Sequence, residues 1–279
     1  MYSGITEQCS REYIRALAAE GRSAATLSKY ARDAAAFVKY LRGRAATKEL
    51  AAEYREHLCG KYAPRSVNSM LAGVNGLLAF AGRPELRVRQ VRVQRQAFCA
   101  EERELTRAEY TRLCRAAAHG GRERLCLLLQ TICGTGIRVS ELQYITVESV
   151  RRGETVVNCK AKTRTVFIVK ALRRKLLRYA AARGIKSGCV FVTRTGRPLG
   201  RTNIWREMKS LCREAGVNAQ KVFPHNLRHL FARVFYAQEK DIAKLADILG
   251  HSSINTTRIY IISTGAEHRR CMERMRLIM

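Results

Sequence analysis

The sequence predicts a mainly α-helical protein with two domains and one small antiparallel β-sheet. Three observations support this prediction. Apolar residues recur at three- and four-residue spacing over most of the chain. Residues that commonly cap helices precede several of these segments. A stretch of alternating arginine and valine near residue 90 separates the first third from the rest, and 279 residues suffice for two modest domains.

The first third is predicted to form a bundle of four helices. The first helix covers roughly residues 6–20. Ser23 can cap the second helix and Thr47 the third, because both side chains can accept a hydrogen bond from the first turn. Pro64 suits the opening turn of the fourth, which runs to about Gly82. The apolar positions of each segment share one face, as a bundle core requires.

Residues 83–100 differ in character from this bundle. Arginines and valines alternate there, and Pro84 interrupts any helix. The pattern predicts an extended basic linker between a first domain at 1–97 and a second at 103–279; an edge strand or a solvated loop is the alternative. The candidate phosphate-backbone contacts of this linker are Arg87, Arg89, Arg92 and Arg95.

The second domain is predicted to be mostly helical with a short β-hairpin. Thr106 and Glu109 have the spacing of a capping box, which marks its first helix. The further predicted elements are a buried helix around 125–132, paired strands over 155–158 and 165–169 joined by residues 159–164, a short strand or turn over 189–192, and mostly helix from Asn203 onward.

The charge of the chain points to a polyanionic partner. Lys and Arg total 52 against 23 Asp and Glu, a formal net charge of +29. Such an imbalance causes self-repulsion unless a polyanion relieves it. Residues 1–97 carry 17 basic and 8 acidic side chains, a net of +9, and residues 98–279 carry 35 and 15, a net of +20. DNA or RNA is the natural partner of both parts, because each neutralised phosphate releases counterions.

Composition argues against several other classes of protein. No apolar run approaches the roughly 20 residues that span a bilayer, and no lipidation signal or basic amphipathic anchor stands out. The N-terminus lacks the character of a secretory signal, so we expect a cytoplasmic protein without a membrane partner. The ten cysteines include no Cys-x-x-Cys pair, which predicts reduced, packed thiols, no metal site and no cofactor.

One helix start gathers three groups that can hold a phosphate. His225, Arg228 and His229 are spaced so that they share one helix face, and Pro224 suits the first turn of that helix. The positive end of the helix dipole favours an anion there. Taken alone, such a triplet equally fits a solvated surface.

A second guanidinium comes from a separate segment. Arg138 follows a Gly-Thr-Gly break, and Glu141 can bridge back to a neighbouring cation or form an ordinary N-terminal helix pair. Arg138 and Arg228 together can clamp a phosphate through bidentate contacts. Lys160 lies at the predicted hairpin tip, as a proton donor or an ordinary loop lysine.

The last informative segment runs from a helix end to a tyrosine. Gly250 stops a helix and His251 follows it, after which Ser252 or Ser253 can cap a short helix that leads to Tyr260. Isoleucines surround Tyr260, so a core aromatic is the alternative reading of this side chain.

In combination, these segments resemble the tyrosine recombinases, the phage-integrase and Xer-like family of site-specific DNA recombinases. Residues 135–142 resemble its first-arginine motif and residues 224–229 its His-x-x-Arg motif. Residues 249–260 resemble its final motif, with the tyrosine nine residues after the histidine. The resemblance covers 103–270 in detail and 10–97 only as a helical core-binding domain.

The resemblance implies a role for each matched residue. Tyr260 is the nucleophile, Arg138 and Arg228 stabilise the pentavalent phosphorus, and His225 and His251 complete the phosphate site, with His225 a candidate general base. Lys160 is the general acid, with Lys162 its rival because the hairpin reads Cys-Lys-Ala where the family often has Gly-Lys-Gly. Glu141 has a structural role and His229 a supporting one.

The resemblance also implies a fold and an activity. We expect a SAM-like core-binding bundle followed by a catalytic domain with the DNA breaking-rejoining fold. The enzyme would cut and rejoin double-stranded DNA through a 3′-phosphotyrosine, as a homotetramer on two DNA sites. An accessory DNA-bending or directionality protein is a candidate partner. The implied setting is the bacterial nucleoid, with a simple Xer-like or mobile-element enzyme that has no further N-terminal domain. The apolar residues of 267–279 can pack within their own domain or on a neighbouring protomer.

Three rival functions remain open from the sequence. A type IB-like topoisomerase shares the chemistry but rejoins the same strand. A catalytically silent DNA-binding regulator shares the fold. A basic RNA-binding protein shares the charge, although the sequence lacks an RNA-recognition signature.

Overall fold

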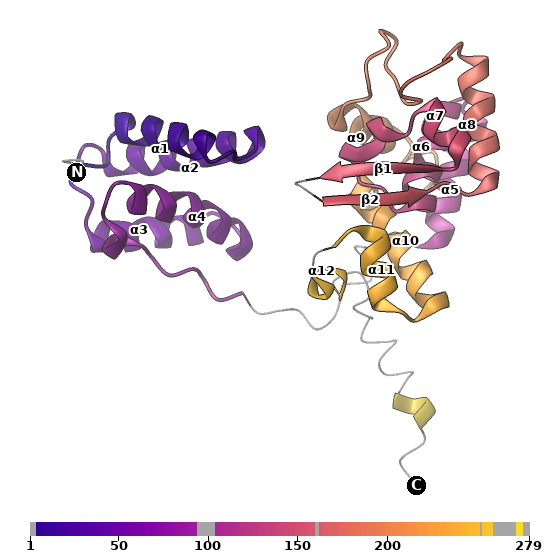
Figure 1. Ribbon diagram of the computed structural model, residues 1–279. Coiled ribbons are helices and arrows are strands. Elements are labelled where there is room, and N and C mark those ends of the chain that lie inside the picture. Colours follow the sequence, from indigo (N-terminus) through magenta and orange to yellow (C-terminus); the bar gives the residue numbers. More distant parts are fainter. Residues whose placement is uncertain (1–3, 94–103, 160–161, 252, 259–271, 276–279) are drawn as a thin grey trace. The chain divides into compact units, whose positions relative to one another are not determined.

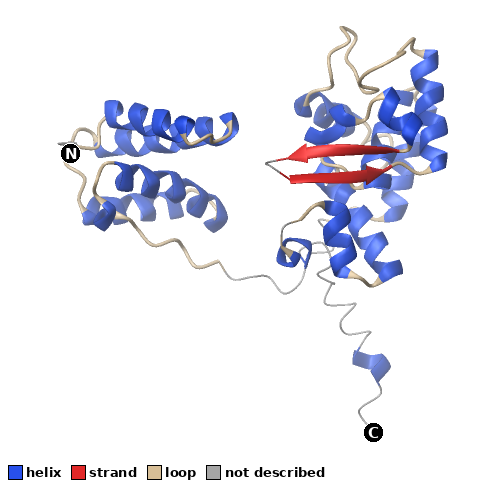
Figure 2. Ribbon diagram, in the orientation of Figure 1, coloured by secondary structure: helices blue, strands red, loops and turns tan. Residues whose placement is uncertain are grey.

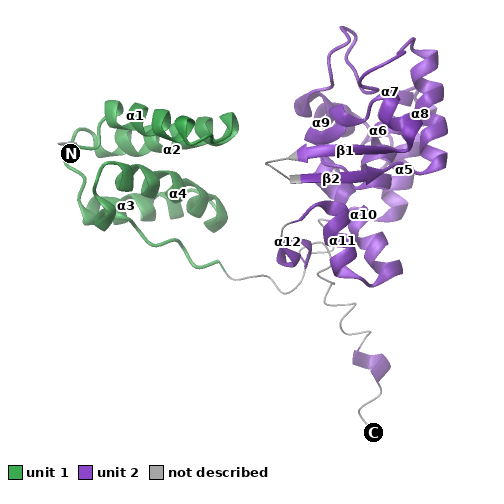
Figure 3. Ribbon diagram, viewed as in Figure 1, with its two compact units in different colours: residues 1–95 green, residues 96–279 purple. Residues whose placement is uncertain are grey.

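The computed structural model describes residues 4–93, 104–159, 162–251, 253–258 and 272–275. Helices dominate these residues, and the sheet found among them is a single antiparallel pair of strands (Figures 1 and 2). The predicted fold class, mainly α with a small antiparallel sheet, is therefore confirmed. The chain divides into two compact units, residues 1–95 and 96–279 (Figure 3).

The first unit is a four-helix bundle with its own core. The predicted caps at Ser23 and Thr47 are confirmed, because each side chain accepts a hydrogen bond from a first-turn N–H, and Thr6 caps the first helix in the same way. Phe37 and Leu71 are fully buried between the helices. The helices are α1 (Glu7–Ala19), α2 (Ala24–Leu41), α3 (Lys48–Cys59) and α4 (Pro64–Phe80).

The first part of the predicted linker belongs to this bundle. A 3-10 turn, η1 (Pro84–Leu86), follows α4, and the chain then runs extended along it. Asn75 of α4 exchanges two hydrogen bonds with the backbone of Val88, at 2.9 and 3.0 Å. Asn68, seven residues earlier, does the same with Val91 at 2.8 and 2.7 Å. The described part of 83–100 is therefore an arm packed on α4.

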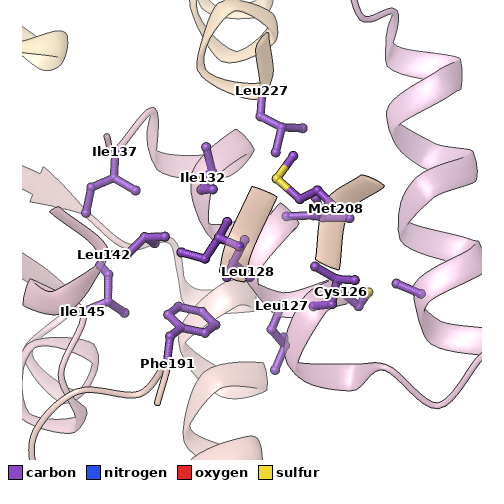
Figure 4. Close-up of a cluster of buried hydrophobic side chains, with 14 of the residues drawn as sticks. Cys126, Leu127, Leu128, Ile132, Ile137, Leu142, Ile145, Phe191, Met208 and Leu227 are labelled. Atoms are coloured by element: carbon purple, nitrogen blue, oxygen red, sulfur yellow. The ribbon is translucent and has the colours of Figure 1, made fainter. Parts of the chain in front are cut away.

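The second unit packs around the helix α6 (Glu123–Thr135), most of whose residues are buried. Leu128 and Ile132 of α6 are fully buried, with Phe191 and Met208 beside them (Figure 4). The other helical elements are α5 (Arg107–His119), η3 (Val139–Tyr144), α7 (Val147–Arg152), α8 (Lys170–Ala182), α9 (Arg201–Ser210), η4 (Ala219–Lys221), α10 (Pro224–Glu239), α11 (Ile242–Leu249) and α12 (Ile254–Arg258).

The hairpin differs from the prediction in its second strand. β1 (Glu154–Cys159) pairs with β2 (Lys162–Phe167), so β2 begins three residues before the predicted 165–169 and ends two residues earlier. It ends early because Val169 becomes the N-cap of α8, a helix that the sequence analysis did not identify. The predicted start was too late because the positions of β2 that face inward include a basic residue, Arg164. This charge interrupts the apolar alternation from which the strand was predicted.

Residues 189–192 form no strand. Single bridges join Cys189 to Thr146 and Val192 to Pro198. Of the two predicted alternatives, strand or turn, the structure therefore has the turn. Within the described ranges, no helix is long and apolar enough to cross a membrane.

Candidate active site

Two helix ends and one helix start bring most of the described site residues together in the second unit. α6 ends at Gly136, whose φ of +64° is the left-handed conformation that glycine adopts easily, and Arg138 then caps η3. α11 ends in the same way at Gly250, with φ of +64°, and His251 follows. Between these two stops lies the opening turn of α10, as Pro224 predicted.

Arg228 of α10 connects both stops. Its side chain is almost fully buried, with the residue 2% exposed. The guanidinium donates to the carbonyl of Gly136, to that of Leu249 at 2.7 Å and to Nε2 of His251 at 3.1 Å. Arg138 reaches the same place from η3, since its Nη2 donates to the carbonyl of Gly250 at 3.4 Å. Both predicted phosphate-binding arginines and His251 therefore share one site.

Glu141 is a buried anchor for two cations. Its carboxylate accepts from Nη1 of Arg138 at 2.8 Å, from the backbone N–H of Arg138 at 2.9 Å and from Nη2 of Arg164 at 2.6 Å. Burial acts to raise the pKa of Glu141, but these hydrogen bonds and charges hold it below its ordinary value. The helix pair with Arg138 is present at i,i+3 spacing, but Glu141 is 2% exposed and binds Arg164 as well.

Arg164 was not predicted as a residue of this site. Its sequence position suggested the hairpin turn, whereas it lies within β2 and points inward. Its Nη1 donates to the carbonyl of Ile248 at 2.8 Å, so Arg164 joins Glu141 to the end of α11. The available signal was its spacing, because Arg164 and the buried Val166 are two residues apart and therefore share a face of the strand.

The histidines of the site are held in the neutral form. Burial, followed by the charges of Arg228 and Arg138, lowers the pKa of His251 to about 4. Burial, followed by the neighbouring His225, lowers the pKa of His229 to about 4. The pKa of His225 is also lowered, by partial burial and then by Arg228. The rings of His225 and His229 meet edge to face, with centroids 5.1 Å apart.

A cavity of about 590 Å³ opens onto these groups. Arg138, His225 and Arg228 line it together with Arg201 and Trp205 of α9. Three guanidinium groups and the neutral imidazole of His225 beside one cavity can bind a tetrahedral oxyanion such as a phosphodiester.

Some predicted residues are not part of what the structure describes. Lys160, Tyr260 and Arg95 lie outside the described residues. Of the remaining predicted arm arginines, Arg87, Arg89 and Arg92 are exposed on the first unit. Among the described residues, no cluster of His, Cys, Asp and Glu side chains could hold a metal ion.

Known proteins share this fold and show the family of the chain. Residues 103–267 match the Phage integrase family. The chain therefore belongs to the phage integrase family, since the match covers more than half of its length.

Named relatives narrow this assignment. The tyrosine recombinase XerA of Pyrococcus furiosus is 29% identical over 98% of this chain and 96% of its own length. XerA of Thermococcus kodakarensis is 32% identical over 78% of this chain and 77% of its own length. Within the family, the protein is a tyrosine-type site-specific recombinase similar to the Xer proteins.

Solved structures share the fold. XerH bound to its difH substrate superimposes with a TM-score of 0.68 and 19% identity, over 88% of this chain and 78% of the XerH chain. A λ integrase dimer bound to a COC′ core site superimposes with a TM-score of 0.72 and 18% identity, over 91% of this chain and 76% of the integrase chain. At these identities, the likeness shows the fold alone.

Proposed function

We propose that the protein cuts and rejoins double-stranded DNA at specific sites through a 3′-phosphotyrosine intermediate. The observation that supports this most strongly is the placement of Arg138 and Arg228 at one cavity, each held by hydrogen bonds, with His251 bonded to Arg228. Preorganised cations of this kind stabilise charge that develops in a transition state. The DNA-bound structures of XerH and λ integrase support duplex DNA as the substrate.

In the proposed reaction, the phenolic oxygen of Tyr260 attacks a backbone phosphorus and displaces the 5′ oxygen of the next nucleotide. His225, neutral at physiological pH, takes the phenolic proton, and Lys160 or Lys162 protonates the leaving oxygen. A 5′-hydroxyl from the partner duplex then attacks the phosphotyrosine and releases Tyr260. One phosphoester replaces another at each step, so no nucleotide is consumed.

The two units have separate tasks in this proposal. The bundle at 1–97 binds the duplex as a core-binding domain, and the exposed Arg87, Arg89 and Arg92 contact its phosphates. The unit at 103–279 carries the chemistry. Recombination between two duplexes needs four active sites, so we propose a homotetramer on two DNA sites.

The proposal is tested by trapping the covalent intermediate. Binding sites are first selected from a randomised duplex library with the Tyr260→Phe variant and then rebuilt as nicked suicide substrates. The wild-type protein is expected to give an adduct on a denaturing gel, unaffected by a chelator, whereas Tyr260→Phe gives none. Arg138→Ala is expected to slow adduct formation by roughly two to three orders of magnitude, as for loss of one preorganised donor.

Other outcomes would assign a different function. An adduct that persists in Tyr260→Phe rejects the nucleophile, and cleavage that requires magnesium rejects the reaction class. Supercoil relaxation without exchange between duplexes would indicate a type IB-like topoisomerase. Binding without any adduct would indicate a silent DNA-binding regulator. In the same assay, Lys160→Ala and Lys162→Ala identify the general acid.

A further inference from the structure

Thr257 is a fully buried polar residue beside the site, and the sequence motifs assign it no role. It lies in α12, which packs against α11, and its exposed fraction is 0%. The neighbouring Thr256, in the same short helix, is exposed. The hydroxyl of Thr257 is 2.8 Å from Nδ1 of His251. A buried hydroxyl requires such a partner, because burying one without a hydrogen bond costs about 1–3 kcal/mol.

Two contacts of His251 determine which of its ring nitrogens carries the proton. Arg228 donates to Nε2 at 3.1 Å, and a guanidinium has no acceptor atom, so Nε2 must be unprotonated. The neutral ring then carries its proton on Nδ1 and donates it to Thr257. Burial and the neighbouring Arg228 favour this neutral form, because they lower the pKa of His251.

Phosphate binding would change what His251 must do. A phosphate oxygen can only accept, so His251 can contact it only through a protonated Nε2, and in a ring that stays neutral Nδ1 is then an acceptor. A hydroxyl donates as well as accepts. Thr257 can therefore stay paired with Nδ1 in both tautomers by rotating its O–H, which a side chain with only one of these capacities cannot do.

We infer that Thr257 is a positioning residue for strand cleavage: it orients the ring of His251 and keeps a hydrogen bond with Nδ1 whichever of the two ring nitrogens carries the proton. The contact also ties α12 to the phosphate site, three residues before Tyr260 in the sequence. The hydrogen bond itself is independent of the proposed function, whereas its role in cleavage rests on that function.

The hydrogen bond is tested without DNA by ¹⁵N NMR of histidine-labelled protein. The chain has 6 histidines, so the signals of His251 are assigned by their loss in His251→Gln. In the wild-type protein near neutral pH, His251 is expected to show a protonated Nδ1 and an unprotonated Nε2. Thr257→Val, which has the same shape without the hydroxyl, is expected to shift both signals. Unchanged signals in Thr257→Val would overturn the inference.

The role in cleavage is tested by single-turnover adduct formation at saturating suicide substrate. Thr257→Val is expected to slow the step about 10- to 100-fold, from the loss of one buried hydrogen bond, with DNA affinity unchanged. Thr257→Ser, which restores the hydroxyl, should recover most of the rate, and the matched surface variant Thr256→Val should match the wild type. A fast Thr257→Val, or a Thr257→Ser as slow as it, contradicts the positioning role. Absence of an adduct in the wild type itself would instead reject the proposed function and leave the NMR result standing.

Discussion

At the scale of single residues, the two arginines of the site are held in different ways. Arg228 is 2% exposed, and its hydrogen bonds include two to backbone carbonyls and one to the imidazole of His251. Arg138 pairs directly with the carboxylate of Glu141, which fixes its orientation. Both guanidinium groups line the cavity, where they can donate to an anion.

The buried histidines predict a dependence of stability on pH. The pKa of His229 and that of His251 are each about 4, below the ordinary 6.5, so the unfolded chain binds protons before the folded one does. The stability that both residues contribute is therefore complete above about pH 6.5 and is lost as the pH falls toward 4. Denaturant unfolding at pH values across this range measures the loss.

The matched variant for this prediction is His229→Gln, which cannot titrate. Its stability is expected to fall less than that of the wild type over the same pH range. Carboxylates such as Glu141 titrate in both proteins, so the difference between the two curves isolates the histidine. Parallel curves would show that His229 is not held neutral in the folded state.

Residue types and spacing predicted which side chains lie near one another, because charged and titratable residues stand out in short motifs. Arg138, Glu141, His225, Arg228 and His251 were identified in this way, and the structure places them around one site. Two positions could not be found as easily. Arg164 interrupts an apolar strand with a charge, and Thr257 looks like any helical threonine until its burial is known.

At the scale of elements, the stop of α11 does more than end a helix. The φ of Gly250 is +64°, which disfavours any side chain. A Cβ added to Gly250 would also lie 2.3 Å from Cδ of Arg164, whose guanidinium is held by Glu141 and by Ile248. The glycine therefore permits both the turn and the close passage of β2, and His251 depends on both.

Gly250→Ala is expected to reduce stability and abolish adduct formation. Left-handed backbone costs an alanine roughly 1–2 kcal/mol, and the contact with Arg164 adds to this cost. Gly184→Ala is the matched control, because Gly184 has φ of +67° with nothing within 4 Å of an added Cβ. The stability of Gly184→Ala should fall only by the cost of the left-handed backbone, and its activity should be retained. Thermal unfolding and the suicide-substrate assay compare the two, and equal losses would refute the role of the close contact.

Element boundaries followed from the sequence where a local interaction sets them. The caps at Thr6, Ser23 and Thr47 and the stop at Gly250 are such cases. The arm after α4 and the start of β2 were misjudged because both depend on distant partners. Nothing local to Val88 shows that Asn75 will pair with its backbone.

At the scale of the whole molecule, the chain consists of two units with separate cores and a charge of +29 spread over both. The first core does not end with the fourth helix, since Leu86 and Val88 of the arm are 5% and 8% exposed within it. The first domain therefore includes the start of residues 83–100, the segment that was predicted from its composition to be a linker.

This boundary is tested with fragments of the first unit. A fragment of residues 1–93 is expected to melt more than about 10 °C above one of residues 1–82, because the shorter one loses two buried apolar side chains and the asparagine hydrogen bonds. Asn75→Ala in the longer fragment should give an intermediate value. Equal melting temperatures for the two fragments would mean that the arm adds nothing to the bundle. Circular dichroism on heating provides the measurement.

The alternation within that arm also separates two kinds of evolutionary constraint. Val88 is buried in the bundle, and the backbones of Val88 and Val91 are hydrogen-bonded to asparagine side chains of α4, whereas Arg87, Arg89 and Arg92 are exposed. If these arginines contact phosphates as proposed, substituting them changes the strength of binding but not the sequence that is recognised. Such changes can accumulate one surface position at a time on an unchanged scaffold.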